Sequence, residues 1–162
     1  QGEAALELVM ALLDWRRKHG VEGPLPLAVI TPFREVRRGF GALLKHHLSG
    51  TARKRRLLRF GTVHTFQGKE DEHVILLLGG DPESSGAQAW AAHPPNLVNV
   101  AVTRARNRLY VIGDRKLWVR QHVLREVAQR LERLTLEQWR TRGHGARRDC
   151  AIDGNGERVS AR

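Results

Sequence analysis

Val74-Ile75-Leu76-Leu77-Leu78 is a run of five aliphatic residues, and it decides the fold class. A strand with one solvent-facing side alternates apolar and polar residues, whereas a strand of a parallel sheet that is covered by helices on both faces does not. The run therefore predicts a buried strand in a parallel sheet. No apolar run in the chain has the length that crosses a bilayer, so we expect no contact with a membrane.

Strand patterns and helix patterns alternate on both sides of this run. Strands are predicted at 25–31, 57–63, 74–78 and 108–113, and helices at 4–19, 32–48, 96–106 and 114–131, with a short helix over 134–139. Thr31-Pro32 reads as an N-cap followed by a first-turn proline, and residues 79–95 read as a long loop. The alternation predicts an α/β fold, a doubly wound and mostly parallel sheet with helices on both faces.

The length of 162 residues suits one domain with its own core, since 41% of the residues are hydrophobic. Hydrophobic periodicity stops at Arg142, so we expect a domain over 1–142 and a flexible basic tail over 143–162. The single cysteine, Cys150, excludes an internal disulfide and a cysteine zinc cluster. This cysteine usage and the lack of a secretory signal pattern favour a cytoplasmic location.

The formal net charge of +11 indicates a polyanionic partner, for which nucleic acid is the leading interpretation. Much of the excess is clustered. Arg53, Lys54, Arg55 and Arg56 form one basic cluster with Arg59, and residues 53–56 are predicted to be an exposed loop that binds nucleic acid. The alternative is that an arginine-rich composition reflects the base composition of the genome.

Two polar segments that adjoin predicted strands carry the candidate chemistry. In the first, Gly61 to Glu70, Gly68 lets the backbone approach a ligand, and Glu70 is able to accept a hydrogen bond from a sugar hydroxyl. In the second, Asn96 to Arg106, an apolar helical stripe leads to Arg104, whose rigid guanidinium suits a phosphate. For the first segment the alternative is an exposed polar turn, and for the second it is an amphipathic helix whose arginines reach solvent. Ligands of such sheets bind at the carboxyl ends of the strands, where we place this site.

These segments together resemble the motifs of superfamily 1 helicases. Thr62-Val-His-Thr-Phe-Gln-Gly-Lys-Glu70 resembles motif V, and Asn96 to Arg106, with the strand up to Asp114, resembles motif VI. Ala28-Val-Ile-Thr-Pro-Phe-Arg34 resembles motif IV. The resemblance covers roughly residues 25 to 120. The residues of these motifs are similar to those of the five-prime-to-three-prime branch that includes the nonsense-mediated decay helicase.

The resemblance implies the second of two RecA-like domains that bind ATP and Mg²⁺ between them and move along single-stranded DNA or RNA. The chain has no Gly-x-x-x-x-Gly-Lys-Ser/Thr loop, and Asp71-Glu72 precedes its predicted strand, so no acidic pair follows a strand to hold the metal. We therefore expect a fragment of a longer polypeptide, or a partner acting in trans, that is inactive alone.

The resemblance also implies roles for individual residues. Arg104 is the catalytic arginine finger; Gly68, Glu70 and Arg34 bind the nucleotide; Thr62, His64 and Thr65 face the nucleic-acid strand; and no residue binds a metal. Arg106 is read as structural or as a phosphate contact. The other hypotheses are a non-catalytic helicase-like module that binds nucleic acid or protein, and a nucleotide-binding α/β domain of another family.

Overall fold

The sheet of this protein is parallel throughout the part that the computed structural model describes, residues 1–19, 27–48, 58–66, 70–80, 86, 89, 91, 96–141 and 150–153. Its strand order is β2-β1-β3-β4-β6-β5, and every neighbouring pair is parallel. The strands are β1 (Leu27–Thr31), β2 (Leu58–Thr62), β3 (Asp71–Leu77), β4 (Ala105–Gly113), β5 (Glu132–Leu134) and β6 (Cys150–Asp153).

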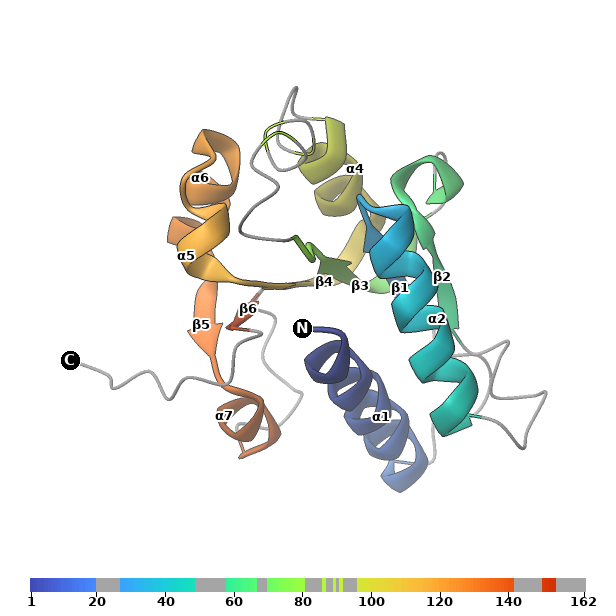
Figure 1. Ribbon diagram of the computed structural model, residues 1–162. Helices are drawn as coiled ribbons and strands as arrows, with labels where there is room; N and C mark the ends of the chain where they lie inside the picture. The colour runs from blue at the N-terminus through green and yellow to red at the C-terminus, as the bar shows by residue number, and fades with distance from the viewer. Residues whose placement is uncertain are drawn as a thin grey trace.

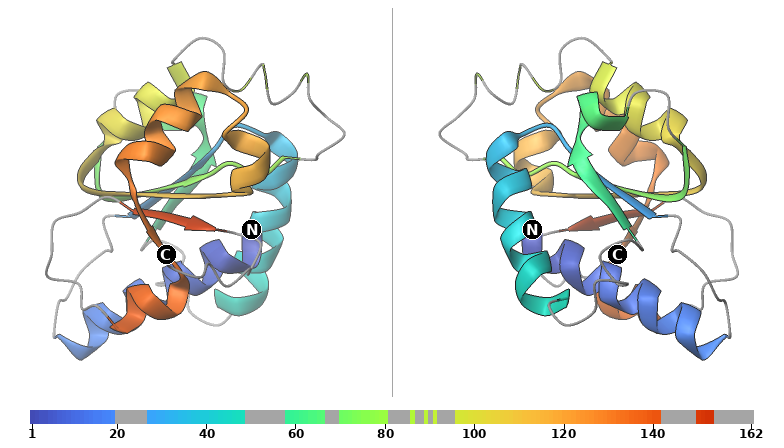
Figure 2. Two further views of the ribbon diagram at one scale, coloured as in Figure 1. Left: turned by 90° about the vertical axis from the view of Figure 1, so that its left-hand side faces the viewer. Right: turned by 90° about the vertical axis from the view of Figure 1, so that its right-hand side faces the viewer.

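Helices cover both faces of the sheet (Figures 1 and 2). On one face lie α1 (Gly2–Lys18), α2 (Arg34–Leu48) and α7 (Leu136–Thr141). On the other lie the 3-10 helix η2 (Val63–Phe66), α4 (Asn96–Arg104), α5 (Arg115–Trp118) and α6 (His122–Arg130). This arrangement confirms the predicted doubly wound α/β fold of RecA-like type.

Strand β3 lies between β1 and β4, and its apolar run explains this central place. Ile75 and Leu77 pack into the core beneath α1 and α2, while Val74, Leu76 and Leu78 pack into the core beneath α4. All five side chains are buried, as the uninterrupted aliphatic pattern predicts. A polar residue within this run would place an unsatisfied group against one of the two helical layers.

Two element boundaries near the candidate site differ from the prediction. Strand β3 begins at Asp71, so Asp71 and Glu72 lie inside the strand and not before it. Helix α4 ends at Arg104, and β4 begins at Ala105, so Arg106 belongs to the strand. Pairing of Ala105 with Asp71 across the sheet overrides the helical pattern that continued to Arg106.

The carboxyl-terminal third also departs from the prediction. The long helix expected over 114–131 is two helices, α5 and α6, because the carbonyl of Val119 accepts from Arg125 Nε (2.9 Å) at the break between them. Residues 132–134, at the junction of the two predicted helices, form β5, and the predicted short helix corresponds to α7. Residues 150–153, within the tail predicted over 143–162, form β6 between β4 and β5. The sheet pairing available to this short segment outweighs its polar surroundings.

The turn at the carboxyl end of β3 requires glycine. Gly79 has φ of 62°, and a Cβ on it would lie 2.3 Å from Cγ2 of Val36. Its carbonyl accepts a hydrogen bond from Trp118 Nε1 at 2.8 Å, which ties the turn to α5.

Most of the predicted loop 79–95 lies outside the described residues. Thr31 ends β1 rather than capping α2, although its Oγ1 accepts from the Phe33 amide at 3.4 Å. No helix in the described ranges combines the length and apolarity needed to cross a membrane.

Candidate nucleotide and nucleic-acid site

The predicted site residues lie at two ends of the sheet, not at one. Thr31 and Thr62 are paired at the carboxyl ends of β1 and β2, where ligands were expected. Glu70 and Arg104 instead precede the paired first residues of β3 and β4, Asp71 and Ala105. The expectation of a single site at the carboxyl ends is therefore wrong for Glu70 and Arg104. Helix α4 leads directly into β4, and its last residue lies at the amino end of that strand.

The carboxyl end carries an open groove of about 530 Å³. It is lined by Arg34, Glu35, Arg37, Arg38, Thr62 and Thr65. Gly61 allows this approach of η2 to β2, since a Cβ on Gly61 would lie 2.9 Å from Oγ1 of Thr65. The Oγ1 atoms of Thr62 and Thr65 are 3.4 Å apart, so the two hydroxyls are presented together. Hydroxyls and guanidinium groups are the donors that contact phosphate backbones.

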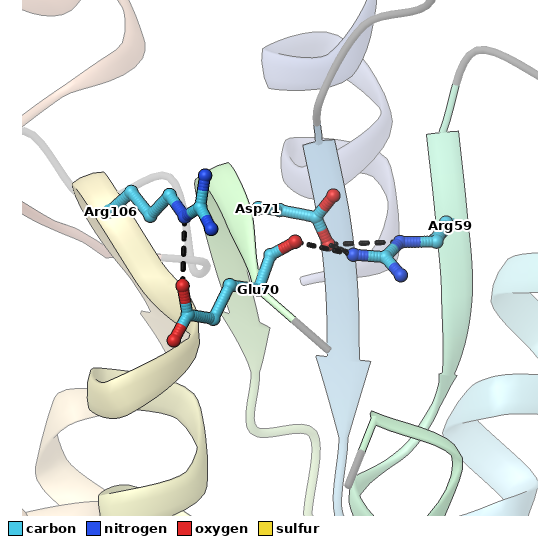
Figure 3. Close-up of polar contacts among 4 residues, drawn as sticks. All are labelled: Arg59, Glu70, Asp71 and Arg106. Atoms are coloured by element: carbon cyan, nitrogen blue, oxygen red, sulfur yellow. Dashed lines mark hydrogen bonds and ion pairs between the residues drawn. The ribbon is translucent and has the colours of Figure 1, made fainter. Parts of the chain in front are cut away.

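The amino end is built around Glu70. Its Oε2 accepts a hydrogen bond from Arg106 Nε at 2.8 Å, and the two side chains are 45% and 64% exposed (Figure 3). The hydrogen bond and charge of Arg106 hold the pKa of the Glu70 carboxyl below its ordinary value of 4.5. Partial loss of water opposes this shift, and the charge of Arg104 adds to it. Glu70 in turn raises the pKa of Arg106.

Arg59 holds the main chain on the other side of Glu70. Its Nη2 donates to the Glu70 carbonyl at 2.6 Å, and its Nε donates to Oδ2 of Asp71 at 3.1 Å (Figure 3). The Asp71 side chain is only 8% exposed. Arg59, which the sequence groups with the basic cluster Arg53 to Arg56, lies in β2 within the predicted strand 57–63 and has an acidic partner, Asp71. The sequence signal for this pair was a charged residue, Arg59, inside a predicted strand and an acid, Asp71, near the start of the next predicted strand.

Arg104 is half-buried at the end of α4, and its Nε is buried without a hydrogen-bond partner among the described residues. The hydroxyl of the preceding Thr103 donates to the carbonyl of Asn99 at 2.6 Å, which secures the last turn of the helix. Arg104 forms no ion pair with any described residue, although its charge helps to lower the pKa of Glu70. A guanidinium in this state has donors left for a ligand.

Several predicted residues are not brought into either group. Gly68 and the basic cluster Arg53, Lys54, Arg55 and Arg56 lie outside the described residues. His64 is exposed on η2, beside the groove residues but not lining it. Arg34 lies with Thr62 and Thr65 rather than with Glu70, and its role at the nucleotide stays a prediction. Across the described ranges, no three His, Cys, Asp or Glu residues are grouped as a metal site requires.

The Glu70 titration tests the geometry of the amino end. In the folded chain we expect its pKa below 4.5, and replacement Arg106→Gln should raise it toward that value because the main stabilising partner is lost. A lowered folded pKa means that the ion pair stabilises the fold above pH 4.5 and stops doing so as pH falls through the lowered pKa. Carbon-detected NMR of the Glu70 carboxyl measures this directly. The variant Arg17→Gln, on α1, is the control, and equal midpoints in the Arg106→Gln and wild-type chains would contradict the pair.

Comparison with known proteins identifies the fold independently. Residues 2–116 match a family model, AAA_12, described as an AAA domain, which is found in superfamily 1 helicases. No curated protein matches the chain significantly. The match spans the predicted motifs IV, V and VI and most of the structure described above, and it does not distinguish the branches of the superfamily. The chain belongs to this AAA domain family and contains a helicase-like, nucleotide-binding α/β domain.

Proposed function

We propose that the chain is the second motor domain of an ATP-dependent superfamily 1 helicase or translocase acting on single-stranded DNA or RNA. The observation that carries the proposal is Arg104, a half-buried guanidinium with an unpartnered Nε among the described residues, next to a Glu70 already held by Arg106. Within this function Arg104 is the arginine finger. We predict from the residues of motifs V and VI that the chain belongs to the branch of the nonsense-mediated decay helicase.

The amino-end residues fit a nucleotide presented by another domain. Arg104 is half-buried and its Nε has no partner among the described residues, so its guanidinium has donors that are proposed to bind a phosphate oxygen. Glu70 commits Oε2 to Arg106, which leaves Oε1 for a ribose hydroxyl. The Gly68 backbone is proposed to lie against the same nucleotide. ATP with Mg²⁺ supplies the phosphoanhydride that is hydrolysed, and the metal ligands and phosphate loop belong to the first RecA-like domain, which we propose as part of the same polypeptide.

The carboxyl end fits the nucleic-acid strand. The groove combines the paired hydroxyls of Thr62 and Thr65 with three guanidinium groups from the first turns of α2. Such donors bind phosphate without reading sequence, which suits a motor that moves along any strand. His64, exposed on η2, is proposed to contact the same strand.

Closure of the two domains would couple these ends. A guanidinium that stabilises charge on a transferring phosphoryl group acts only while it is in contact with that group. Arg104 would therefore contribute when the domains are closed over ATP and separate from the phosphates after hydrolysis. Thr62 and Glu70, one at each proposed end, are only eight positions apart in the sequence, and we propose that this short separation couples the two ends.

A motor needs a second, ATP-binding domain beside this one, whereas a non-catalytic binding module does not. Sequencing the coding region on the amino-terminal side of Gln1 tests the proposal at once. A motor requires a Gly-x-x-x-x-Gly-Lys-Ser/Thr loop and an acidic strand end there or in an obligatory partner. Their absence from both would favour the module and contradict ATP-driven movement.

The basic cluster gives a test of strand binding. Replacing Arg53, Lys54, Arg55 and Arg56 by alanine should weaken binding of single-stranded oligonucleotides uniformly across sequences. Each lost phosphate contact lowers the slope of log Kobs against log salt by about 0.7, so the slope should fall by up to about 3. Fluorescence anisotropy over a salt series measures it. Alanine at Arg17 and Lys18, on α1, should leave the slope unchanged; an unaltered slope in the cluster variant would reduce that loop to a solvated surface.

A further inference from the structure

The segment that connects β2 to β3 is short for its path. Eight residues, 63–70, lead from the carboxyl end of β2 to the amino end of β3, and β1 lies between these two parallel strands. The described parts of this connection, residues 63–66 and Glu70, therefore adjoin opposite ends of the sheet. The connection carries His64 and Thr65 near its start and Glu70 at its end. Its position sets where both sets of side chains point.

One side chain from β2 contacts both described parts of this connection. The Cζ atom of Arg59 lies 5.8 Å from the centre of the Phe66 ring, which is buried in the core beneath α4. Its Nη2 donates to the Glu70 carbonyl at 2.6 Å. Its Nε and Nη2 both donate to Oδ2 of Asp71, the first residue of β3. Arg59 therefore joins the end of η2 to the beginning of β3.

Burial makes this contact set specific to arginine. The Asp71 side chain is 8% exposed, and a carboxylate so far from water needs a charged hydrogen-bonding partner. The flat guanidinium reaches Asp71 with two nitrogens while one of these also serves the Glu70 carbonyl, and its face lies against an aromatic ring. A lysine ammonium is a single donor centre on a flexible stem and cannot reproduce this arrangement.

We propose that Arg59 is a positioning residue for Glu70. Arg59 fixes the main chain at Glu70, and Arg106 fixes its carboxylate, so the free carboxylate oxygen is held ready for the sugar hydroxyl of a ribonucleotide (Figure 3). The inference rests on the proposed function, because it gives Glu70 a nucleotide to bind. Pre-organisation of this kind contributes to binding and not to the chemical step.

The test is a double-mutant cycle in the complete two-domain ATPase. Glu70→Gln should raise the KM for ATP about tenfold through loss of one charge-assisted hydrogen bond. Arg59→Lys should raise KM to a similar degree, with kcat within about twofold of the wild-type value. The double variant should be no worse than Glu70→Gln alone, since Arg59 acts through Glu70. Arg17→Lys, which alters an exposed pair with Asp14 on α1, is the matched control.

A second measurement on the 162-residue chain separates positioning from general stability. Hydrogen exchange in Arg59→Lys should rise about tenfold or more at the amides of Phe66, Glu70 and Asp71. The amides of Tyr110 and Val111 in β4 should stay protected at the wild-type level. An equal rise everywhere would make Arg59 a plain stability residue and overturn the inference.

The cycle distinguishes failure of the inference from failure of the function. If Glu70→Gln leaves KM for ATP unchanged, Glu70 is not a nucleotide ligand, and that part of the proposed function fails together with this inference. If Glu70→Gln raises KM but Arg59→Lys does not, or if the two effects multiply, only the role of Arg59 is overturned.

Discussion

Replacement of Arg104 by alanine is expected to lower ATP turnover in the two-domain protein by about 10³–10⁵-fold. In the proposed finger role the guanidinium would stabilise charge on the phosphoryl oxygens in the transition state, and no other described cation at the end of α4 lacks a partner in the same way. Since the proposal gives most of the nucleotide contacts to the other domain, KM should change little. Steady-state phosphate release in the presence of single-stranded nucleic acid measures both constants.

Two further variants test whether the loss of turnover in Arg104→Ala comes from the guanidinium itself. Arg104→Lys keeps the charge but not the planar fork, so its turnover should lie between wild type and alanine. Arg120→Ala removes an exposed arginine after α5 and should behave as wild type. A kcat for Arg104→Ala within a few-fold of the wild-type value would remove Arg104 from the finger role and leave an ordinary half-buried arginine.

The 162-residue chain alone is expected to hydrolyse no ATP. Its sequence has no phosphate loop, and the consecutive acids Glu70, Asp71 and Glu72 lie at the amino end of β3. Asp71 is bound to Arg59, and Glu72 accepts a hydrogen bond from Asn107, so both carboxylates are already used. In the proposed function the described residues would supply a finger and a carboxylate, and the other domain would supply the metal site and the phosphate cradle.

Phosphate release by the purified chain, with and without single-stranded nucleic acid, measures this prediction. The Arg104→Ala chain is the control, because a contaminating ATPase would be unaffected by the substitution. Turnover that depends on Arg104 in the isolated chain would contradict the two-domain account. Background turnover that is equal in both chains would support it.

The fold was predictable because its determinants are local and periodic. The run Val74 to Leu78 specifies a strand buried on both sides, and the alternation of strand and helix patterns then leaves a doubly wound sheet as the natural arrangement. The order β2-β1-β3-β4 follows from helices that pack on both faces. By contrast, β6 pairs with β4 and β5 through four residues in a polar stretch, and no local pattern indicates such a partner.

The candidate residues could be named from the sequence, but their geometry could not be predicted. The motif resemblance supplied Glu70, Arg104, Thr62 and Thr65, and the general rule for such sheets placed them all at the carboxyl ends of the strands, which is wrong for Glu70 and Arg104. Their distribution depends on where β3 and β4 begin, and both boundaries moved by three residues under tertiary pairing. The contact between Arg59 and Asp71 crosses an intervening strand, so spacing along the chain does not reveal it.

Arg106 shows how a local pattern misleads. The sequence places it on the same predicted helix as Arg104, with a structural or phosphate-contact role. In the structure the chain changes from helix to strand between them, so Arg106 turns to Glu70 while Arg104 keeps a buried Nε without a partner among the described residues. Two arginines two positions apart thus have different partners because they belong to different elements.

The most direct test of the central claim is a crystal structure of the two-domain protein with ADP, Mg²⁺ and aluminium fluoride, which imitates the transferring phosphoryl group. The account predicts a nitrogen of Arg104 at hydrogen-bonding distance, about 2.7–3.2 Å, from the fluoride ligands. A structure in which Arg104 remains within its own domain, bound to Glu70 and directed away from the nucleotide, would contradict it.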